Sequence, residues 1–392
     1  MISFAAVITT KAGTITDLGT LGGSFSYANG INASGQVVGF STTAGDASVG
    51  AFLYSGGVMT NLGTFGGLVS GATGINASGQ VVGYSYTAGN AAEFAFLYSG
   101  GVMTNLGALG GSQSTANAIN NAGQVVGQAY TGGDASADAF SYSGGVMTDL
   151  GAGSDSTATG INASGQIVGD NSSNGFLDSG GVVTSLPTLG GSSSQPAGIN
   201  DAGQIVGQAS TAGDATTDAF LYSGGVMTDL GTLGGDGGSN AYAINASGEV
   251  VGASATLTNA AGDAFLYTTS SGMIDLNSLL PAGSGWDLQV ATAINDSGQV
   301  VGFGTNPEGQ QDAFLMDTTP EPASMALFGA SAALLVMMRK KLRRPDSAWH
   351  RLTSQASLRV AADIASPATI SMVDSRRALA RSMSLCDTLP IA

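Results

Sequence analysis

Short apolar runs alternate with glycine-rich polar turns along most of this chain. Within residues 71–107 the apolar positions fall in four pieces, which read G-A-T-G-I-N, Q-V-V-G-Y-S-Y, F-A-F-L-Y and V-M-T-N-L-G. Each piece has the length of a short β-strand, and the Asn, Ser and Gly residues between the pieces are typical of tight turns. The pattern therefore predicts four short strands that follow one another as an antiparallel meander.

The same unit recurs along the chain, and each copy carries the motif I-N-x-x-G-[QE]-[VI]-V-G. The seven copies begin at Ile31, Ile75, Ile119, Ile161, Ile199, Ile244 and Ile294, so successive starts lie 38 to 50 residues apart. A period of this size, with four strands in each copy, is typical of the blades of a β-propeller.

The second and third strands of each copy are apolar at consecutive positions, as at Val81, Val82 and residues 95–98. Consecutive apolar residues indicate strands that are buried on both faces. A blade packed between two neighbouring blades provides such an environment, whereas a sandwich with one wet face would alternate apolar and polar residues.

The order of the pieces at the two ends of the array suggests a closed ring. Six copies are followed by a segment like V-M-T-N-L-G, but the seventh runs from residues 313–316 directly into residues 319–322. The missing piece, I-T-D-L-G, stands at residues 15–19. We therefore expect an all-β fold over residues 15–318, a seven-bladed β-propeller of four-stranded blades in which the N-terminal strand completes the last blade. The alternative is an open β-solenoid, which needs no such offset and normally carries distinct capping units.

Charge is distributed unevenly along the chain. Residues 1–319 contain 22 of the 27 acidic residues but only one base, Lys11. Such a surface lacks the basic groups that bind phosphate, so nucleic acid is excluded as a partner. Acidic loops such as A-G-D at residues 44–46 could contribute oxygen ligands to Ca²⁺, but no complete ligand spacing is present. No cofactor and no metal site is therefore predicted.

The repeats contain no Cys, His or Arg, since Cys386 and His350 both follow them. This composition excludes Cys- or His-based nucleophile and base pairs, imidazole metal sites and disulfide closure. No catalytic residue is predicted, although a pair of carboxylates could still act in glycoside hydrolysis.

A different pattern follows the repeats. Pro320, Glu321 and Pro322 precede residues 323–338, which carry no charge, and a basic cluster at residues 339–344 comes next. This order predicts a short hydrophobic helix that enters the inner membrane transiently with a basic flank on the cytoplasmic side. The alternative is a buried helix of the repeat domain. The basic residues are Arg339, Lys340, Lys341, Arg343 and Arg344.

Two resemblances follow from these motifs. Residues 320–344 resemble the PEP-CTERM sorting signal, in which Pro-Glu-Pro, a hydrophobic helix and an Arg-rich cluster are recognised by an exosortase. This resemblance implies an exported cell-envelope or extracellular protein of a Gram-negative bacterium that makes exopolysaccharide. Residues 15–316 resemble the HAF family of extracellular repeats, whose units read D-L-G-T-L-G-G, A-x-x-I-N-x-x-G-Q-V-V-G and H-A-F-L. In place of that family's His, this chain has Gly50, Phe94, Asp138, Asn174, Asp218, Asp263 and Asp312.

The flanking segments depart from the pattern of an exported protein. Residues 1–14 contain only a short apolar run without a preceding base, so we expect that a signal peptide is missing or truncated. Residues 345–392 extend beyond the basic cluster, and their composition predicts a disordered or frame-shifted tail.

These observations favour an exported, non-catalytic module of the cell envelope or biofilm matrix that binds exopolysaccharide or serves a structural role. The alternative is an extracellular polysaccharide hydrolase or lyase on a propeller scaffold. The candidate ligand-binding residues are Trp286, Asp287, Asp138, Asp218, Asp263 and Asp312. Trp286 belongs to a long insertion at residues 277–290 and either stacks on a sugar ring or fills the joint between the sixth and seventh blades. Glu93, Glu249 and Glu308 also break the repeat, and Glu249 is expected to be a solvated hairpin residue.

Overall fold

The computed structural model describes residues 13–172, 174–259 and 262–318. They belong to one compact unit, Met1–Pro320, while the second unit, Glu321–Ala392, lies outside the described residues. Regular structure in the described part consists of β-strands and five short 3-10 turns. The prediction of an all-β repeat region built from four-stranded sheets is therefore confirmed.

The strands follow the repeats of the sequence. The first half contains β1 (Thr14–Asp17), β2 (Gly22–Ile31), β3 (Val37–Thr43), β4 (Val49–Ser55), β5 (Val58–Asn61), β6 (Gly66–Ile75), β7 (Val81–Thr87), β8 (Glu93–Ser99), β9 (Val102–Asn105), β10 (Gly110–Ile119), β11 (Val125–Thr131), β12 (Ala137–Ser143), β13 (Val146–Asp149) and β14 (Thr157–Ile161). The second half contains β15 (Ile167–Asp170), β16 (Gly175–Asp178), β17 (Val183–Ser185), β18 (Gly190–Ile199), β19 (Ile205–Thr211), β20 (Thr217–Ser223), β21 (Val226–Asp229), β22 (Gly234–Ile244), β23 (Val250–Thr256), β24 (Asp263–Thr268), β25 (Gly272–Asp275), β26 (Asp287–Ile294), β27 (Gln299–Thr305) and β28 (Gln311–Asp317). The 3-10 turns are η1 (Ala44–Asp46), η2 (Ala88–Asn90), η3 (Gly132–Asp134), η4 (Ala212–Asp214) and η5 (Leu276–Leu279).

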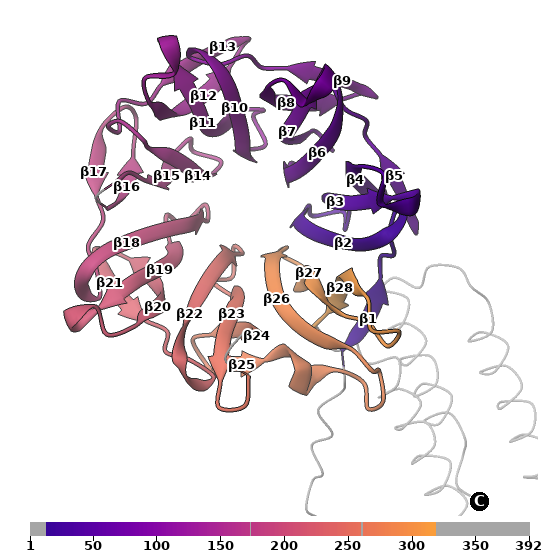
Figure 1. The fold of residues 1–392 in the computed structure, drawn as a ribbon. Coiled ribbons are helices and arrows are strands. Elements are labelled where there is room, and N and C mark those ends of the chain that lie inside the picture. The colour runs from indigo at the N-terminus through magenta and orange to yellow at the C-terminus, as the bar shows by residue number, and fades with distance from the viewer. Residues whose placement is uncertain (1–12, 173, 260–261, 319–392) are drawn as a thin grey trace, which may run out of the picture. The chain divides into compact units, whose positions relative to one another are not determined.

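Four separate sheets, β10–β13, β14–β17, β18–β21 and β22–β25, each contain four antiparallel strands in chain order. The remaining strands form three more antiparallel groups, which single parallel bridges at Phe25–Gln311 and Val49–Val69 connect. Figure 1 shows that the sheets surround a common centre, with the first strand of each group innermost. Strand β1 pairs with β28 in antiparallel register, so that Thr16 lies opposite Leu315. The N-terminal strand therefore joins the last group of the chain.

Each copy of the I-N-x-x-G-Q motif builds the turn between its first and second strands. In the second copy, Asn76 Oδ1 accepts hydrogen bonds from the N–H groups of Ser78 (3.1 Å) and Gln80 (3.0 Å). Gly79 donates its N–H to the Asn76 carbonyl over 3.0 Å and has a φ of +78°, which glycine adopts without a Cβ clash. Asn76 is 3% exposed, so the motif places a buried amide at a defined point of every copy.

The same amide also connects neighbouring sheets. Asn76 Nδ2 donates to Gln80 Oε1 (2.8 Å) and to the carbonyl oxygen of Asn120 (3.2 Å) in the next sheet. Both amide protons and the oxygen are therefore satisfied, as a buried amide requires. Equivalent inter-sheet bonds run from Asn32 to Asn76, Asn120 to Asn162, Asn162 to Asn200, Asn200 to Asn245, Asn245 to Asn295 and Asn295 to Asn32.

The hydrophobic core is divided into clusters that lie between adjacent sheets. One fully buried Phe occupies each copy, at Phe52, Phe96, Phe140, Phe176, Phe220, Phe265 and Phe314. The second and third strands are buried on both faces as predicted, since Val81, Val82, Ala95 and Phe96 are all inaccessible to solvent. Burying each phenyl group contributes about 1.5–3 kcal/mol, so packing between sheets is a major source of stability. One cluster combines Val37 and Phe52 with Val301 and Ala313, which joins the first group to the last.

The insertion at residues 277–290 contains regular structure, because η5 occupies its start and β26 begins at Asp287. Asn277 holds the two ends together, since its Oδ1 accepts from Leu288 N (2.7 Å) and its Nδ2 donates to Leu288 O (3.0 Å). Glu249 lies in the hairpin turn between β22 and β23 as expected, but its side chain is half-buried, and its Oε2 accepts from Asn245 Nδ2 over 2.7 Å. Glu249 takes the place that Gln has in the other copies.

Candidate functional site

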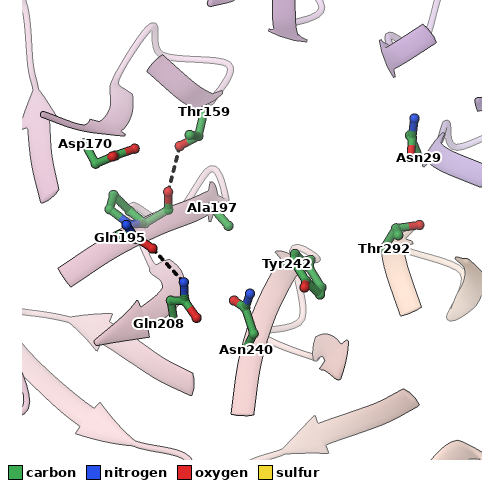
Figure 2. Close-up of a pocket in the computed structure, with 10 residues that line it drawn as sticks. Asn29, Thr159, Asp170, Gln195, Ala197, Gln208, Asn240, Tyr242 and Thr292 are labelled. Carbon is green, nitrogen blue, oxygen red and sulfur yellow. Dashed lines mark hydrogen bonds between the residues drawn. The ribbon is translucent and has the colours of Figure 1, made fainter. Parts of the chain in front are cut away.

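A cavity of about 520 Å³ lies among the innermost strands of the sheets. Figure 2 shows Asp170, Gln195 and Gln208 on one side of this central cavity, and Asn29 and Thr292 on the other. The lining residues come from β2, β14, β15, β18, β19, β22 and β26. They are Asn29, Thr159, Asp170, Gln195, Pro196, Ala197, Gln208, Asn240, Tyr242 and Thr292.

Several lining residues occupy the same place in the repeat, two residues before the motif Ile. In five copies this residue is Asn or Thr, and its side chain donates to a backbone carbonyl of the next sheet over 2.8 Å. These bonds run from Asn29 to Ala72, Thr73 to Ala116, Asn117 to Ala158, Thr159 to Pro196 and Thr292 to Ala28. The residue therefore has a structural role wherever the repeat is regular.

Ala197 and Tyr242 break this series in two consecutive copies. Alanine has no side-chain donor, and tyrosine places an aromatic ring where the other copies place a short polar group. Tyr242 is 36% exposed, which leaves part of its ring open to the cavity. The two departures lie in adjacent sheets. The side of the cavity that these sheets form therefore differs in composition from the side that the regular copies form.

The groups around this break are polar and mostly neutral. Gln208 Nε2 donates to Gln195 Oε1 over 2.6 Å, and Asn240 lies beside Tyr242 (Figure 2). Asp170 is half-buried, and burial raises the pKa of its carboxyl above the ordinary value. Amide groups, a carboxyl group and an aromatic face can bind a ligand rich in hydroxyl groups, because they offer both donors and acceptors and a flat apolar surface.

The structure places the four predicted aspartates at equivalent positions of different sheets, near the outer strand. On that strand, each position faces the residue that precedes the repeat Leu. In the first copy, a Cβ built on Gly50 would meet Asn61 Nδ2 at 2.8 Å. Burial is the main cause that raises the pKa of Asp218, and the negative charge of Asp229 on the outer strand raises it further. Burial raises the pKa of Asp275 most, and smaller contributions come from Asp263 and Asp287. Asp263 and Asp287 therefore both act on Asp275, whereas Asp138, Asp218 and Asp312 each lie in a different sheet.

Asp312 has the most perturbed environment of these residues. Burial, followed by the charges of Asp17 and Glu308, raises its pKa to about 6, although a hydrogen bond from Asn306 acts in the opposite direction. Asp312 is 3% exposed, and its Oδ1 has no hydrogen-bond partner in the described part of the protein. The Oδ1 atoms of Asn174 and Asp218, at the same repeat position, are also buried without a partner.

Trp286 packs against the core cluster between the sixth and seventh copies. Its ring lies edge-on to Phe314, with a centroid distance of 6.3 Å, and the same cluster contains Leu266, Leu276 and Leu288. Asp287 is exposed at the start of β26. Neither residue lines the central cavity.

The other acidic residues that the sequence singled out have local partners or face solvent. Thr115 Oγ1 donates to Glu93 Oε1 over 2.6 Å, while Glu308 is exposed in the turn before β28. Asp46, in the acidic loop considered for Ca²⁺, accepts a hydrogen bond from Ser24 N over 2.8 Å, and this bond lowers the pKa of its carboxyl. Within residues 13–318, gaps aside, no three His, Cys, Asp or Glu residues are grouped as a set of metal ligands.

Sequence reasoning missed the central cavity and the acidic partners on the outer strands. An alignment of the seven copies would have pointed to the cavity, because Ala197 and Tyr242 stand where the other five copies have Asn or Thr. Asp17, the partner of Asp312, comes from the opposite end of the chain, so spacing along the sequence gave no indication of this pair.

Comparison with known proteins gives one family match. Residues 318–344 match the PEP-CTERM protein-sorting motif. This motif marks an exported or cell-envelope protein that exosortase-type sorting machinery recognises. The predicted signal residues 320–344, including the helix at residues 323–338, lie outside the described residues, as do residues 1–12 and 345–392. Where the structure is described, it contains no helix long and apolar enough to span a bilayer.

No curated protein matches the chain. Among solved structures, it is similar to YCF48 bound to D1 peptide, with 11% identity over 81% of this chain and 98% of that chain and a TM-score of 0.46. It is also similar to XC5397, a gluconolactonase from Xanthomonas campestris (9% identity, 79% and 95% coverage, TM-score 0.37). A third similar structure is Trypanosoma rangeli sialidase (11% identity, 86% and 58% coverage, TM-score 0.33). Such distant likenesses carry no inference about activity.

Proposed function

We propose that the repeats form a closed seven-bladed β-propeller on an exported protein. Four separate sheets and three further groups supply the blades, and the pairing of β1 with β28 supplies the closing strand. Two other contacts support closure, namely the bond from Asn295 Nδ2 to Asn32 O (3.1 Å) and the core cluster that unites Val37 with Val301.

We further propose that this propeller is a non-catalytic module of the cell envelope or biofilm matrix, and that it binds extracellular polysaccharide in the central cavity. The observation that carries this proposal is the local break of the repeat at Ala197 and Tyr242, beside Gln195, Gln208 and Asn240. A stacking ring flanked by amides is suited to a sugar with many hydroxyl groups.

The charge of the protein restricts the class of polysaccharide. Residues 13–318 contain no Lys, Arg or His, so a uronic acid or a sulfated sugar would find no cationic partner there. A neutral polysaccharide avoids this repulsion. Among the ten lining residues Asp170 is the one carboxyl group, whereas a glycosidase usually needs two, which favours binding over hydrolysis.

The test is a glycan array followed by calorimetric titration of the neutral polysaccharides that bind. The informative variant is Tyr242→Thr, since Thr occupies this place in other copies and should preserve the fold. We expect wild-type binding, at least about tenfold weaker binding by Tyr242→Thr, and an unchanged melting temperature. Asp287→Asn, outside the cavity, is the control and should bind normally. Equal binding by wild type and Tyr242→Thr, no neutral glycan bound, or cleavage of the bound glycan would overturn the proposal.

A further inference from the structure

Two carboxyl groups meet where the first strand joins the last. Asn306 Nδ2 lies 2.8 Å from Asp312 Oδ2 on β28 and 3.4 Å from Asp17 Oδ2 at the end of β1. One amide group therefore bridges two acids from opposite ends of the described chain. Glu308, in the turn that precedes β28, is the third acid whose charge acts on Asp312.

The positive charge that would balance these acids is missing from the described part of the chain. Asp312 is buried, and its Oδ1 has no donor. Residues 13–318 contain no Lys, Arg or His, so no side chain there can neutralise the pair. An ionised carboxylate is costly to bury unless a counter-charge or hydrogen bonds compensate it. Either protonation of Asp312 or a cation from the solvent can supply this compensation.

The same deficit recurs at an equivalent position of another sheet. Asp218 is 9% exposed, its Oδ1 also lacks a partner, and Asp229 of the outer strand contributes to its raised pKa. At the same repeat position, Asp138 accepts a hydrogen bond from Asp155 N (3.2 Å) and Asp263 accepts one from Asn259 Nδ2 (2.7 Å), so the unpaired carboxylate oxygen is specific to the copies of Asp218 and Asp312. It is not a singular irregularity at the chain ends.

We propose that Asp17 and Asp312 bind a hard divalent cation such as Ca²⁺, which fastens β1 to β28. Carboxylate oxygens are the preferred ligands of such ions, and Oδ1 of Asp312, although buried, has no hydrogen-bond donor that competes with an ion. Because only two protein carboxylates are adjacent and water must complete the coordination, the site belongs with the weak Ca²⁺ sites of extracellular modules, with dissociation constants of roughly 0.1–1 mM. The Asp218–Asp229 pair is a second, equivalent site. This inference is independent of the proposed polysaccharide site.

Thermal unfolding of the full chain with and without about 5 mM CaCl₂, near pH 7.5, tests the proposal. We expect Ca²⁺ to raise the melting temperature of the wild type by about 2 °C or more. Asp312→Asn and Asp17→Asn should each lose about half of this rise or more, and Asp312→Asn combined with Asp218→Asn should lose nearly all of it. Asp236→Asn, which removes an exposed acid elsewhere, should keep the full rise and controls for net charge.

The outcomes separate a bound cation from a bound proton. Calorimetric titration should show Ca²⁺ uptake by the wild type near pH 7.5 and weaker uptake near pH 5, where a proton competes for Asp312. The proposal is overturned if Ca²⁺ leaves the wild-type melting temperature unchanged, or raises it equally in Asp312→Asn. It is also overturned if acidification alone stabilises the cation-free protein and Ca²⁺ adds nothing at the higher pH. Asp17 is exposed, so Asp17→Asn remains informative even if Asp312→Asn does not fold.

Discussion

Asn295 Nδ2 donates a hydrogen bond to the carbonyl oxygen of Asn32 over 3.1 Å, although 263 residues separate the two along the chain. Every other motif Asn makes the same bond to the next copy, as Asn32 does to Asn76 over 3.1 Å. The bond from Asn295 returns this series to its starting residue. The contact between the ends of the array is therefore built from the same side chain as the contacts within it.

Loss of this amide should destabilise the protein. Asn295→Ala removes the bond to Asn32 and also leaves the N–H groups of Ser297 and Gln299 without their acceptor. Because the site is buried, we expect the free energy of unfolding to fall by about 2–4 kcal/mol. Asn61→Ala is the matched control, because the Asn61 side chain is exposed and accepts a single hydrogen bond, from Gly63 N. Urea unfolding should show a much smaller loss for the control, and equal losses would contradict the role of the motif Asn.

The glycine that ends each V-V-G is required by close packing between the first two strands. A Cβ at Gly302 would collide with the carbonyl oxygen of Val290 on the adjacent strand. Gly302→Ala should therefore cost about 3 kcal/mol or more. Gly132→Ala is the control, since a Cβ there would meet nothing within 4 Å and other copies have Ala at this position. Its unfolding midpoint should match or slightly exceed that of the wild type, and a similar loss in both variants would show that this account of Gly302 is wrong.

Trp286 should contribute to stability and leave glycan binding unaffected. Its ring packs on Phe314 and the cluster around Leu276. Because the side chain is half-buried, we expect Trp286→Ala to lower the free energy of unfolding by about 2–3 kcal/mol. The central cavity should bind polysaccharide as before. A variant that melts normally but no longer binds glycan would instead favour a stacking platform at Trp286.

Stability should depend on pH through Asp312. Its pKa of about 6 in the folded protein exceeds the ordinary value of 3.8, so the folded state holds a proton more tightly than the unfolded chain. Stability should therefore decrease as the pH rises from about 4 through 6, by up to about 3 kcal/mol from this group. Asp170, Asp218 and Asp275, whose pKa values are also raised, act in the same direction.

The measurement is urea unfolding in cation-free buffer near pH 5 and near pH 7.5. The wild type should be more stable at the lower pH, and Asp312→Asn should show a smaller difference because its side chain does not titrate. Asn can still accept the bond from Asn306, so the variant should fold. Equal pH dependence in the two proteins would assign the effect to other carboxyl groups.

The four-stranded units could be predicted because local chemistry defines them. The motif Asn, the Gly at positive φ and the paired Val residues act within a few residues of one another, and the structure has them as expected for Asn76, Gly79, Val81 and Val82. The burial of both sheet faces follows from consecutive apolar residues in the same way. These features repeat, so each copy supports the interpretation of the others.

The contacts that depend on distant parts of the chain could not be predicted from spacing. Asp312 was identified as a departure from the repeat, but its neighbour Asp17 lies in β1. The central cavity requires residues from seven strands, and only comparison among copies at the position of Tyr242 would have indicated it. The acidic loop at Asp46 appeared suited to cations, yet its carboxylate accepts a backbone N–H that the sequence does not reveal.

The most direct test of ring closure is a disulfide between β1 and β28. Thr16 and Leu315 are opposite residues in this pair, where Cα atoms of antiparallel strands are about 5.5 Å apart and a disulfide is allowed. The variant carries Thr16→Cys and Leu315→Cys, with Cys386→Ser to remove the native thiol. The account predicts that mild oxidation of the folded monomer consumes both thiols and increases its mobility in non-reducing electrophoresis. Two thiols that stay free and reactive in the folded monomer would contradict it.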